Sequence, residues 1–292
     1  MYELNQVGMR TYYVNCPAKI GIYRANETAV YLIDSGNDKD AGKKVRKILE
    51  EQGWSLKGII NTHSHADHIG GNRYLQQQTG CKIFSAGVET AFTNHPILEP
   101  VTLYGGYPYQ ALRHKFLMAQ ESEAVDVTDA EFPKELEIIP LNGHSMEMIG
   151  IRTPDDVVFL ADAVSSEQTL EKYQISFVYD VAEYLKTLDR VEQMQAELFI
   201  PAHADAASDI RPLAVLNRQK VLQIAETLQS ILKTPMGFEQ LLQRVFAEYG
   251  LTMTFEQHAL VGSTVRSYLS WLGDSGKVQA EIRENQILWC SL

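Results

Sequence analysis

Short apolar runs alternate with turn residues along the chain as far as Ala207, a pattern typical of short strands. Strands are predicted over residues 9–14, 20–23, 29–34, 54–62, 79–86, 135–140, 148–153, 157–162 and 198–201. Apolar positions three and four apart predict helices over residues 38–52, 71–78 and 179–196. Strands interleaved with helices predict an α/β chain.

After Ala207 the spacing becomes helical. Helices are predicted over residues 211–232, 235–249 and 254–273, followed by a strand pair over residues 276–282 and 286–289 that turns at Glu284-Asn285. Helices followed by a two-stranded wing resemble a winged-helix module. We therefore predict a catalytic domain over residues 1–208 and a small C-terminal helical, winged-helix-like module over residues 209–292.

Charge limits what this module can bind. The chain carries a net charge of −11, and from Arg211 onward there are eight Lys and Arg residues against seven Asp and Glu. Nucleic-acid readers usually concentrate cations on one face. Nucleic acid is thus an unlikely partner, and we expect the module to pack, to wall a substrate site or to support a homo-oligomer.

The cysteines and the N-terminal residues bear on location. Cys16, Cys81 and Cys290 are widely separated, which argues against a disulfide framework and suits a reducing cytoplasm. The N-terminal residues lack a basic start and an apolar core, so no signal peptide is expected. No run of eighteen apolar residues occurs, so no membrane contact is expected. These features predict a cytoplasmic protein.

Ligand-type side chains crowd one stretch, Asn-Thr-His-Ser-His-Ala-Asp-His-Ile-Gly-Gly over residues 61–71. His63 and His65 lie two apart, so an extended segment points both to one side. Asp67 and His68 follow where the chain turns into a helix. A lone histidine is usually structural, but four such groups within six residues are costly unless something binds them. Nitrogen and oxygen ligands of this kind suit zinc.

The segment His63-Ser64-His65-Ala66-Asp67-His68 resembles the H-x-H-x-D-H signature of the metallo-β-lactamase-fold hydrolases. Three later elements resemble the rest of that family's set: Gly143-His144-Ser145, an apolar strand ending at Asp162, and a short strand followed by His203. The full resembling set is His63, His65, Asp67, His68, His144, Asp162 and His203.

The resemblance implies a four-layer αββα sandwich of two mixed β-sheets. It also implies two Zn²⁺ ions per chain, with Fe or Mn as alternatives. His63, His65 and His144 would bind the first metal, and Asp67, His68 and His203 the second. Asp162 and a water-derived hydroxide would bridge the two metals, and Asp67 and Asp162 would be the catalytic residues.

Within that family the resemblance favours hydrolysis of a small ester-like substrate, a thioester or lactone, in a branch similar to glyoxalase II. Position 65 is His, whereas diiron redox relatives tend to carry Glu there. Position 162 is Asp, whereas genuine β-lactamases usually carry Cys or Ser there. The alternatives are a metal-dependent phosphodiesterase or ribonuclease, and a non-catalytic protein that keeps metal for structure.

Two segments remain open. Asp34-Ser35-Gly36 either supports the metal loop, as in the resembling family, or forms a plain turn. Residues 87–130, which include a predicted helix over 110–120, form either a lid or a surface excursion. His95 and His114 are isolated and are predicted not to be ligands.

Overall fold

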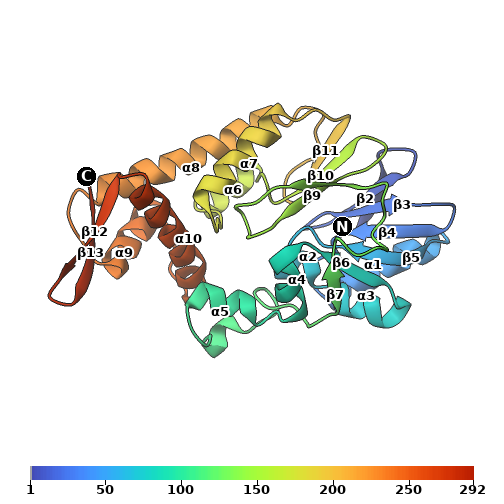
Figure 1. The fold of residues 1–292 in the computed structure, drawn as a ribbon, viewed down its shortest axis with the longest axis horizontal. Helices are drawn as coiled ribbons and strands as arrows, with labels where there is room; N and C mark the ends of the chain where they lie inside the picture. Colours follow the sequence, from blue (N-terminus) through green and yellow to red (C-terminus); the bar gives the residue numbers. More distant parts are fainter. Residues whose placement is uncertain (1) are drawn as a thin grey trace.

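The computed structural model describes residues 2–292 and contains two mixed β-sheets packed face to face (Figure 1). The first sheet has the order β1-β2-β3-β4-β5-β6-β7, antiparallel as far as β4 and parallel from β4 to β7. Its strands are β1 (Glu3–Gln6), β2 (Thr11–Asn15), β3 (Ile20–Arg24), β4 (Ala29–Ile33), β5 (Ser55–Ile60), β6 (Lys82–Ser85) and β7 (Ala124–Asp126). The sequence did not predict β1 and β7.

The second sheet has the order β11-β10-β9-β8, in which only the β10–β11 pair is parallel. Its strands are β8 (Glu137–Pro140), β9 (Ile149–Arg152), β10 (Val157–Ala161) and β11 (Leu198–Pro201). Apolar side chains from the facing sheets fill the space between them, among them Ile33 and Ile60 from the first and Ile151 and Phe159 from the second. This shared core fixes how the strand ends of the two sheets meet.

Helices cover the outer face of each sheet. On the first sheet lie α1 (Lys39–Glu51) and α3 (Asn72–Thr79), and on the second lie α7 (Val181–Gln193) and α8 (Arg211–Ile231). Asp38 starts α1 by accepting hydrogen bonds from the backbone N–H groups of residues 40 and 41, while Val45 and Leu49 face the sheet. The predicted four-layer αββα sandwich is confirmed.

The C-terminal part contains the predicted helices and the predicted strand pair. They are α8, α9 (Phe238–Glu248), α10 (Phe255–Asp274) and the hairpin of β12 (Val278–Arg283) and β13 (Gln286–Ser291). Glu284 and Asn285 turn the hairpin with positive φ angles of 49° and 62°. One apolar cluster contains β-sheet residues such as Phe199 together with Val265 of α10, so the core runs across the predicted boundary at 208/209. That boundary stays a prediction.

The segment between β6 and β8 holds α4 (Gly87–Asn94), α5 (Leu98–Tyr104) and a short 3₁₀ helix (Gln110–Leu112). The predicted helix over residues 110–120 was therefore wrong beyond Leu112. Leu112 and Leu117 are five residues apart and belong to one apolar cluster with Ala259 of α10. The chain turns between the two leucines, so they do not lie on one face of a helix. The sequence also missed α4, α5 and α6 (Glu167–Tyr173). Within residues 2–292, no helix is long and apolar enough to cross a membrane.

Candidate metal centre

The ligand-rich loop leaves the end of β5 and enters the short helix α2 (Ala66–Ile69) at His65. Gly70 and Gly71 then allow two backbone segments to touch. A Cβ atom at Gly70 would lie 2.3 Å from the carbonyl carbon of Asn37, and one at Gly71 would lie 2.3 Å from the carbonyl oxygen of Ser35. This close packing holds the loop against the turn that follows β4.

The structure brings all seven predicted side chains together. Their ligand-type atoms form three overlapping groups, each within 4.8 Å: His63, His65 and His144; His63, His68 and Asp162; and Asp67, His68 and His203. The loop after β5 supplies four of them, and the segments after β8, β10 and β11 supply the other three. His95 and His114 are in none of these groups, which cover the described chain from Tyr2 onward.

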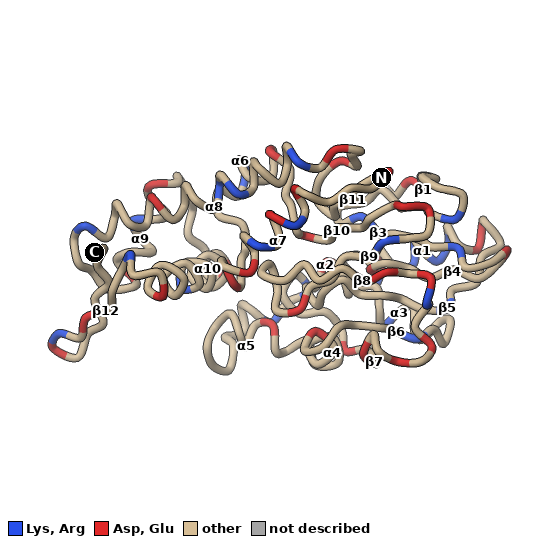
Figure 2. Tube along the Cα trace, turned by 45° about the horizontal axis from the view of Figure 1, so that its top comes forward, with Lys and Arg blue, Asp and Glu red and all other residues tan. Residues whose placement is uncertain are grey.

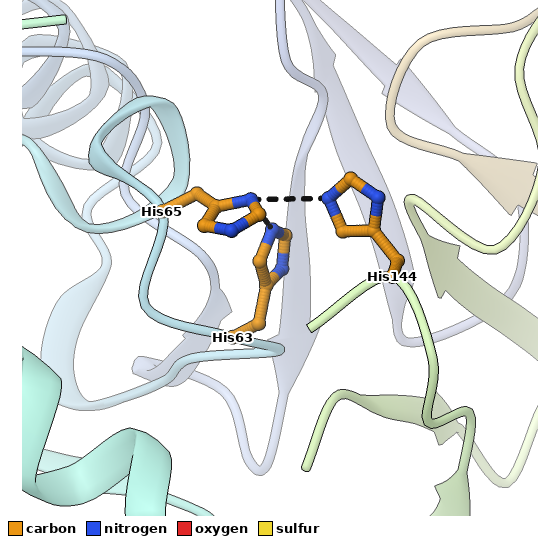
Figure 3. A group of neighbouring side chains, drawn as sticks. All are labelled: His63, His65 and His144. Carbon is orange, nitrogen blue, oxygen red and sulfur yellow. Dashed lines mark hydrogen bonds between the residues drawn. The ribbon is translucent and has the colours of Figure 1, made fainter. Parts of the chain in front are cut away.

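The first three histidines point their nitrogen atoms at one another (Figure 3). His65 Nδ1 lies 3.0 Å from both His63 Nε2 and His144 Nε2. His144 Nδ1 lies 3.1 Å from the carbonyl oxygen of Phe177, which can only accept, so this nitrogen carries the proton. The hydroxyl of Thr62 donates to Asp34 and thus accepts from His63 Nδ1. The inward Nε2 atoms of His63 and His144 are therefore lone-pair donors, as a metal requires.

The second group follows the same arrangement. Asp34 Oδ2 accepts from His68 Nδ1 at 2.8 Å, and the carbonyl oxygen of Pro17 accepts from His203 Nδ1 at 3.0 Å. Both Nε2 atoms thus face inward and offer a lone pair to a metal when the imidazole is neutral, and His203 Nε2 lies 3.1 Å from Asp67 Oδ2. The contact of Asp34 shows that the Asp34-Ser35-Gly36 turn supports the loop rather than merely reversing the chain.

Asp162 lies between the two groups. Its Oδ1 is 3.2 Å from His68 Nε2, and its Oδ2 is 3.4 Å from His144 Nε2 and 3.5 Å from His203 Nε2. One carboxylate therefore contacts histidines of both groups. This is the placement that a ligand shared by two cations needs.

Burial and charge divide the histidines into two kinds. Burial and the neighbouring histidines hold the pKa of His63 well below its usual range, and burial lowers the pKa of His144 to about 3. The carboxylate of Asp162 raises the pKa of His203 to about 10. Burial alone would lower the pKa of His68, but the carboxylates of Asp162 and Asp67 outweigh it and raise that pKa well above 6.5.

Two polar atoms at the centre have no partner in the protein. His68 Nε2 and Asp162 Oδ1 are buried and make no hydrogen bond among the described residues. Buried polar atoms normally have hydrogen-bond partners. An imidazole nitrogen beside a carboxylate oxygen is a pair of ligands that suits a metal cation. The seven side chains thus fit a metal pair of the kind that nitrogen and oxygen ligands hold.

The sequence missed two carboxylates that border the centre. Glu89 of α4 is buried and accepts hydrogen bonds from the loop that carries the first histidines. Glu99 of α5 places Oε1 3.7 Å from His65 Nε2, and burial raises the pKa of Glu99. Neither residue lies in a motif that resembles a metal-binding motif. The only signal in the sequence was that residues 87–130 lack the regular spacing of apolar residues that strands show.

A cleft of about 990 Å³ opens over the candidate ligands. Glu99, Leu117 and Phe177 line it, together with Leu260 and Val261 of α10. Residues 87–130 therefore form part of the cleft wall. This position favours the first of the two predictions for this segment, a cover of the site, over a surface excursion.

A family comparison agrees with this geometry. The family model of the metallo-beta-lactamase superfamily matches residues 15–203, which include every candidate ligand. The chain belongs to the metallo-beta-lactamase superfamily. The family resemblance predicted from the histidine motifs is thereby confirmed.

Curated relatives from this superfamily match over shorter stretches. The hydroxyacylglutathione hydrolase of Methylococcus capsulatus is 45% identical over 42 residues, covering 14% of this chain and 16% of the relative. Hydroxyacylglutathione hydrolase GloC of Haemophilus influenzae is 28% identical over 140 residues, covering 48% of this chain and 63% of the relative. The chain thus spans less than two thirds of the length of these relatives.

Solved structures of the superfamily share the whole architecture. A metallo-beta-lactamase family protein from Thermus thermophilus superposes with a TM-score of 0.72 at 16% identity, covering 100% of this chain and 98% of the other. A beta-lactamase domain protein from Burkholderia ambifaria gives a TM-score of 0.75 at 15% identity, covering 99% and 94%. At these identities the likeness shows the fold alone.

Proposed function

We propose that the protein is a dinuclear metal hydrolase that cleaves a small ester-like substrate, a thioester or a lactone. The observation that carries this proposal is the convergence of inward lone pairs from the histidines upon the shared carboxylate Asp162. The relatives that are named hydroxyacylglutathione hydrolases support the thioester side of the proposal. Zinc suits this donor set best, with iron or manganese as alternatives.

His63, His65 and His144 would hold one metal, Asp67, His68 and His203 the other, and Asp162 both. When bound, the metals supply Lewis-acid polarisation of the scissile carbonyl and a water made acidic enough to attack near neutral pH.

The protein side chains fix the geometry of this chemistry. Hydrogen bonds from the outer nitrogens of His68, His144 and His203 to Asp34, Phe177 and Pro17 hold each imidazole in one tautomer and one orientation. Burial raises the pKa of Asp67, but His68 and His203 outweigh burial and lower this pKa to about 2. The Asp67 carboxylate therefore stays ionised. The proposed reaction uses water as the nucleophile and needs no thiol. In agreement with this, no cysteine lines the cleft among the described residues.

The C-terminal module is proposed to wall the substrate cleft rather than to read nucleic acid. Helix α10, which precedes the wing, packs on α5 and contributes Leu260, Val261 and Thr264 to the cleft. Figure 2 shows Lys and Arg interspersed with Asp and Glu along α8, α9 and the β12–β13 hairpin, without a continuous cationic face. We therefore propose a small-molecule substrate and no nucleic-acid partner.

The test combines metal analysis with a substrate panel. The purified protein should contain about two metal ions per chain and should hydrolyse thioesters or lactones faster than phosphodiesters, oligonucleotides or β-lactams. Asp162→Ala should abolish turnover while the far-UV circular dichroism stays unchanged. Metal content well under one ion per chain after reconstitution with zinc, iron and manganese, together with no turnover, would refute the proposal.

A further inference from the structure

The wall of the cleft is apolar and acidic beyond the candidate ligands. Apolar side chains such as Phe116, Leu117, Phe177 and Leu260 line it. Its remaining charged residues are the carboxylates Glu99, Glu167, Asp205 and Glu256 and the amines Lys19 and Lys172. Carboxylates therefore outnumber amines in the part of the cleft that would hold the substrate away from its reacting carbonyl.

Each amine makes one hydrogen bond within the protein. Lys19 Nζ donates to the carbonyl oxygen of Ala204 at 2.5 Å, and burial lowers the pKa of Lys19. Lys172 Nζ donates to the Tyr173 hydroxyl at 3.1 Å and lies 4.7 Å from the centre of that ring. No arginine lines the cleft in the described chain. The forked guanidinium that usually recognises a carboxylate is thus missing from this wall.

Glu99 is the least accessible of the four carboxylates. Its side chain is 14% exposed, against 38% for Glu256, while Glu167 and Asp205 are exposed residues. It borders the main cleft and also a smaller recess lined by Phe92 and Leu103. A substrate group entering from either side would meet this carboxylate.

The carboxylate of Glu99 lacks donors from the protein. His65 Nε2 lies 3.7 Å from Glu99 Oε1, beyond hydrogen-bond distance, and no described residue donates a hydrogen bond to this carboxylate. A nearly buried carboxylate without donors is costly, and a ligand that brings an N–H or O–H group removes that cost.

We propose that this cleft selects an uncharged or cationic substrate, and that Glu99 is the specificity-determining residue that accepts a hydrogen bond from its hydroxyl, amide or ammonium group. The inference rests on the proposed function and narrows its substrate class. A carboxylate at the remote end of the substrate would meet Glu99, whose carboxylate has no Lys or Arg nitrogen within 4 Å among the described residues.

The test uses thioesters with one acyl group and one reacting centre, whose remote end carries a carboxamide, a carboxylate or an ammonium group. Holding the reacting centre constant leaves the remote group as the only difference among the three substrates. For the wild-type protein, kcat/KM should be at least about tenfold lower for the carboxylate than for the carboxamide, as one like-charge contact predicts, and highest for the ammonium.

Glu99→Gln keeps the shape and a carbonyl acceptor but removes the charge. It should reduce the tenfold difference between carboxylate and carboxamide to about threefold, mainly through KM, with metal content unchanged. Glu171→Gln removes an exposed charge of α6 that does not line the cleft, and it should leave the difference intact.

Two results would overturn the inference. In one, the wild-type protein prefers the carboxylate-bearing thioester. In the other, Glu99→Gln slows all three substrates equally, which means that Glu99 acts only by orienting His65. Both results require an active enzyme. A metal-loaded protein that cleaves none of the series would instead remove the proposed function, and this inference with it.

Discussion

Glu89 and Ser64 form a buried pair in which one carboxylate oxygen accepts two hydrogen bonds, from the Ser64 backbone N–H at 3.0 Å and from its hydroxyl at 2.5 Å. The other oxygen of Glu89 accepts from the backbone N–H of Glu147 at 3.0 Å. Ser64 lies between His63 and His65, and Glu147 follows His144 by three residues. One side chain of α4 therefore ties together the two loops that carry the first three candidate ligands.

Glu89→Gln should loosen both loops. Glutamine offers one oxygen and one NH₂ group, so at least one of the two backbone donors loses its acceptor and faces another donor. We expect metal affinity to fall about 10- to 100-fold, as for changes that disturb ligand orientation, and the free energy of unfolding to fall by about 1–3 kcal/mol. Zinc competition titration and thermal melting measure the two effects.

The matched control is Glu27→Gln, which changes an exposed glutamate in the turn between β3 and β4. It should leave both quantities unchanged. Equal metal affinity in the wild-type and Glu89→Gln proteins would show that the loops hold their positions without this carboxylate.

Asp34→Asn tests the tautomer of His68 without disturbing the backbone. Asp34 has a φ of +64°, which asparagine tolerates. In the wild-type protein, Asp34 Oδ1 accepts from the Thr62 backbone N–H and Asp34 Oδ2 accepts from His68 Nδ1. If the asparagine oxygen takes the place of Oδ1, the asparagine NH₂ group takes the place of Oδ2 and donates to His68 Nδ1. The proton of His68 then moves to Nε2, and the inward lone pair is lost. Metal affinity should fall about 10- to 100-fold.

Metal stoichiometry by mass spectrometry and titration with a coloured chelator check this outcome. Asp274→Asn, at the exposed end of α10, is the control and should bind metal like the wild-type protein. Full affinity in Asp34→Asn would show that the hydrogen bond from His68 does not set its tautomer.

Metal binding should release protons and strengthen as pH rises. Asp162 raises the pKa of His203 to about 10, and the pKa of His68 is also raised, so at neutral pH both carry protons in the metal-free protein. A metal must displace those protons because only the neutral imidazole binds it. Affinity should therefore drop about tenfold per pH unit for each displaced proton as pH falls.

Isothermal titration of metal-free protein in buffers of different ionisation enthalpy counts the released protons. Asp162→Asn removes the charge that raises the pKa of His203, so fewer protons should be released in that variant. A heat of binding that is independent of the buffer would contradict the protonation state assigned to His68 and His203.

Short-range patterns explain why the sequence located the candidate ligands. His63, His65, Asp67 and His68 lie in one loop, so their spacing alone places them together. His144, Asp162 and His203 each follow an apolar strand, and the second sheet brings those strand ends to the edge that faces the loop. The strands were predicted from their apolar pattern, whereas the four-layer arrangement was implied by the family resemblance.

Glu89 and Glu99 could not be found in this way, because their roles come from tertiary contacts alone. Both lie on helices of eight residues or fewer, where apolar periodicity is too short to mark a face. The helix predicted over residues 110–120 failed for a related reason. Leu112 and Leu117 pack on α10, a partner whose position the local sequence does not show.

Gly70→Ala tests whether the contact between the ligand loop and the turn after β4 is needed. The added Cβ would lie 2.3 Å from the carbonyl carbon of Asn37, which is backbone and cannot move aside cheaply. We expect a loss of about 1–3 kcal/mol in the free energy of unfolding, together with weaker metal binding, because α2 carries Asp67 and His68. Gly106→Ala, where a Cβ meets nothing within 4 Å, should leave stability equal or slightly higher. Chemical denaturation of both variants measures the difference, and equal stability of Gly70→Ala and Gly106→Ala would show that the two segments separate without cost.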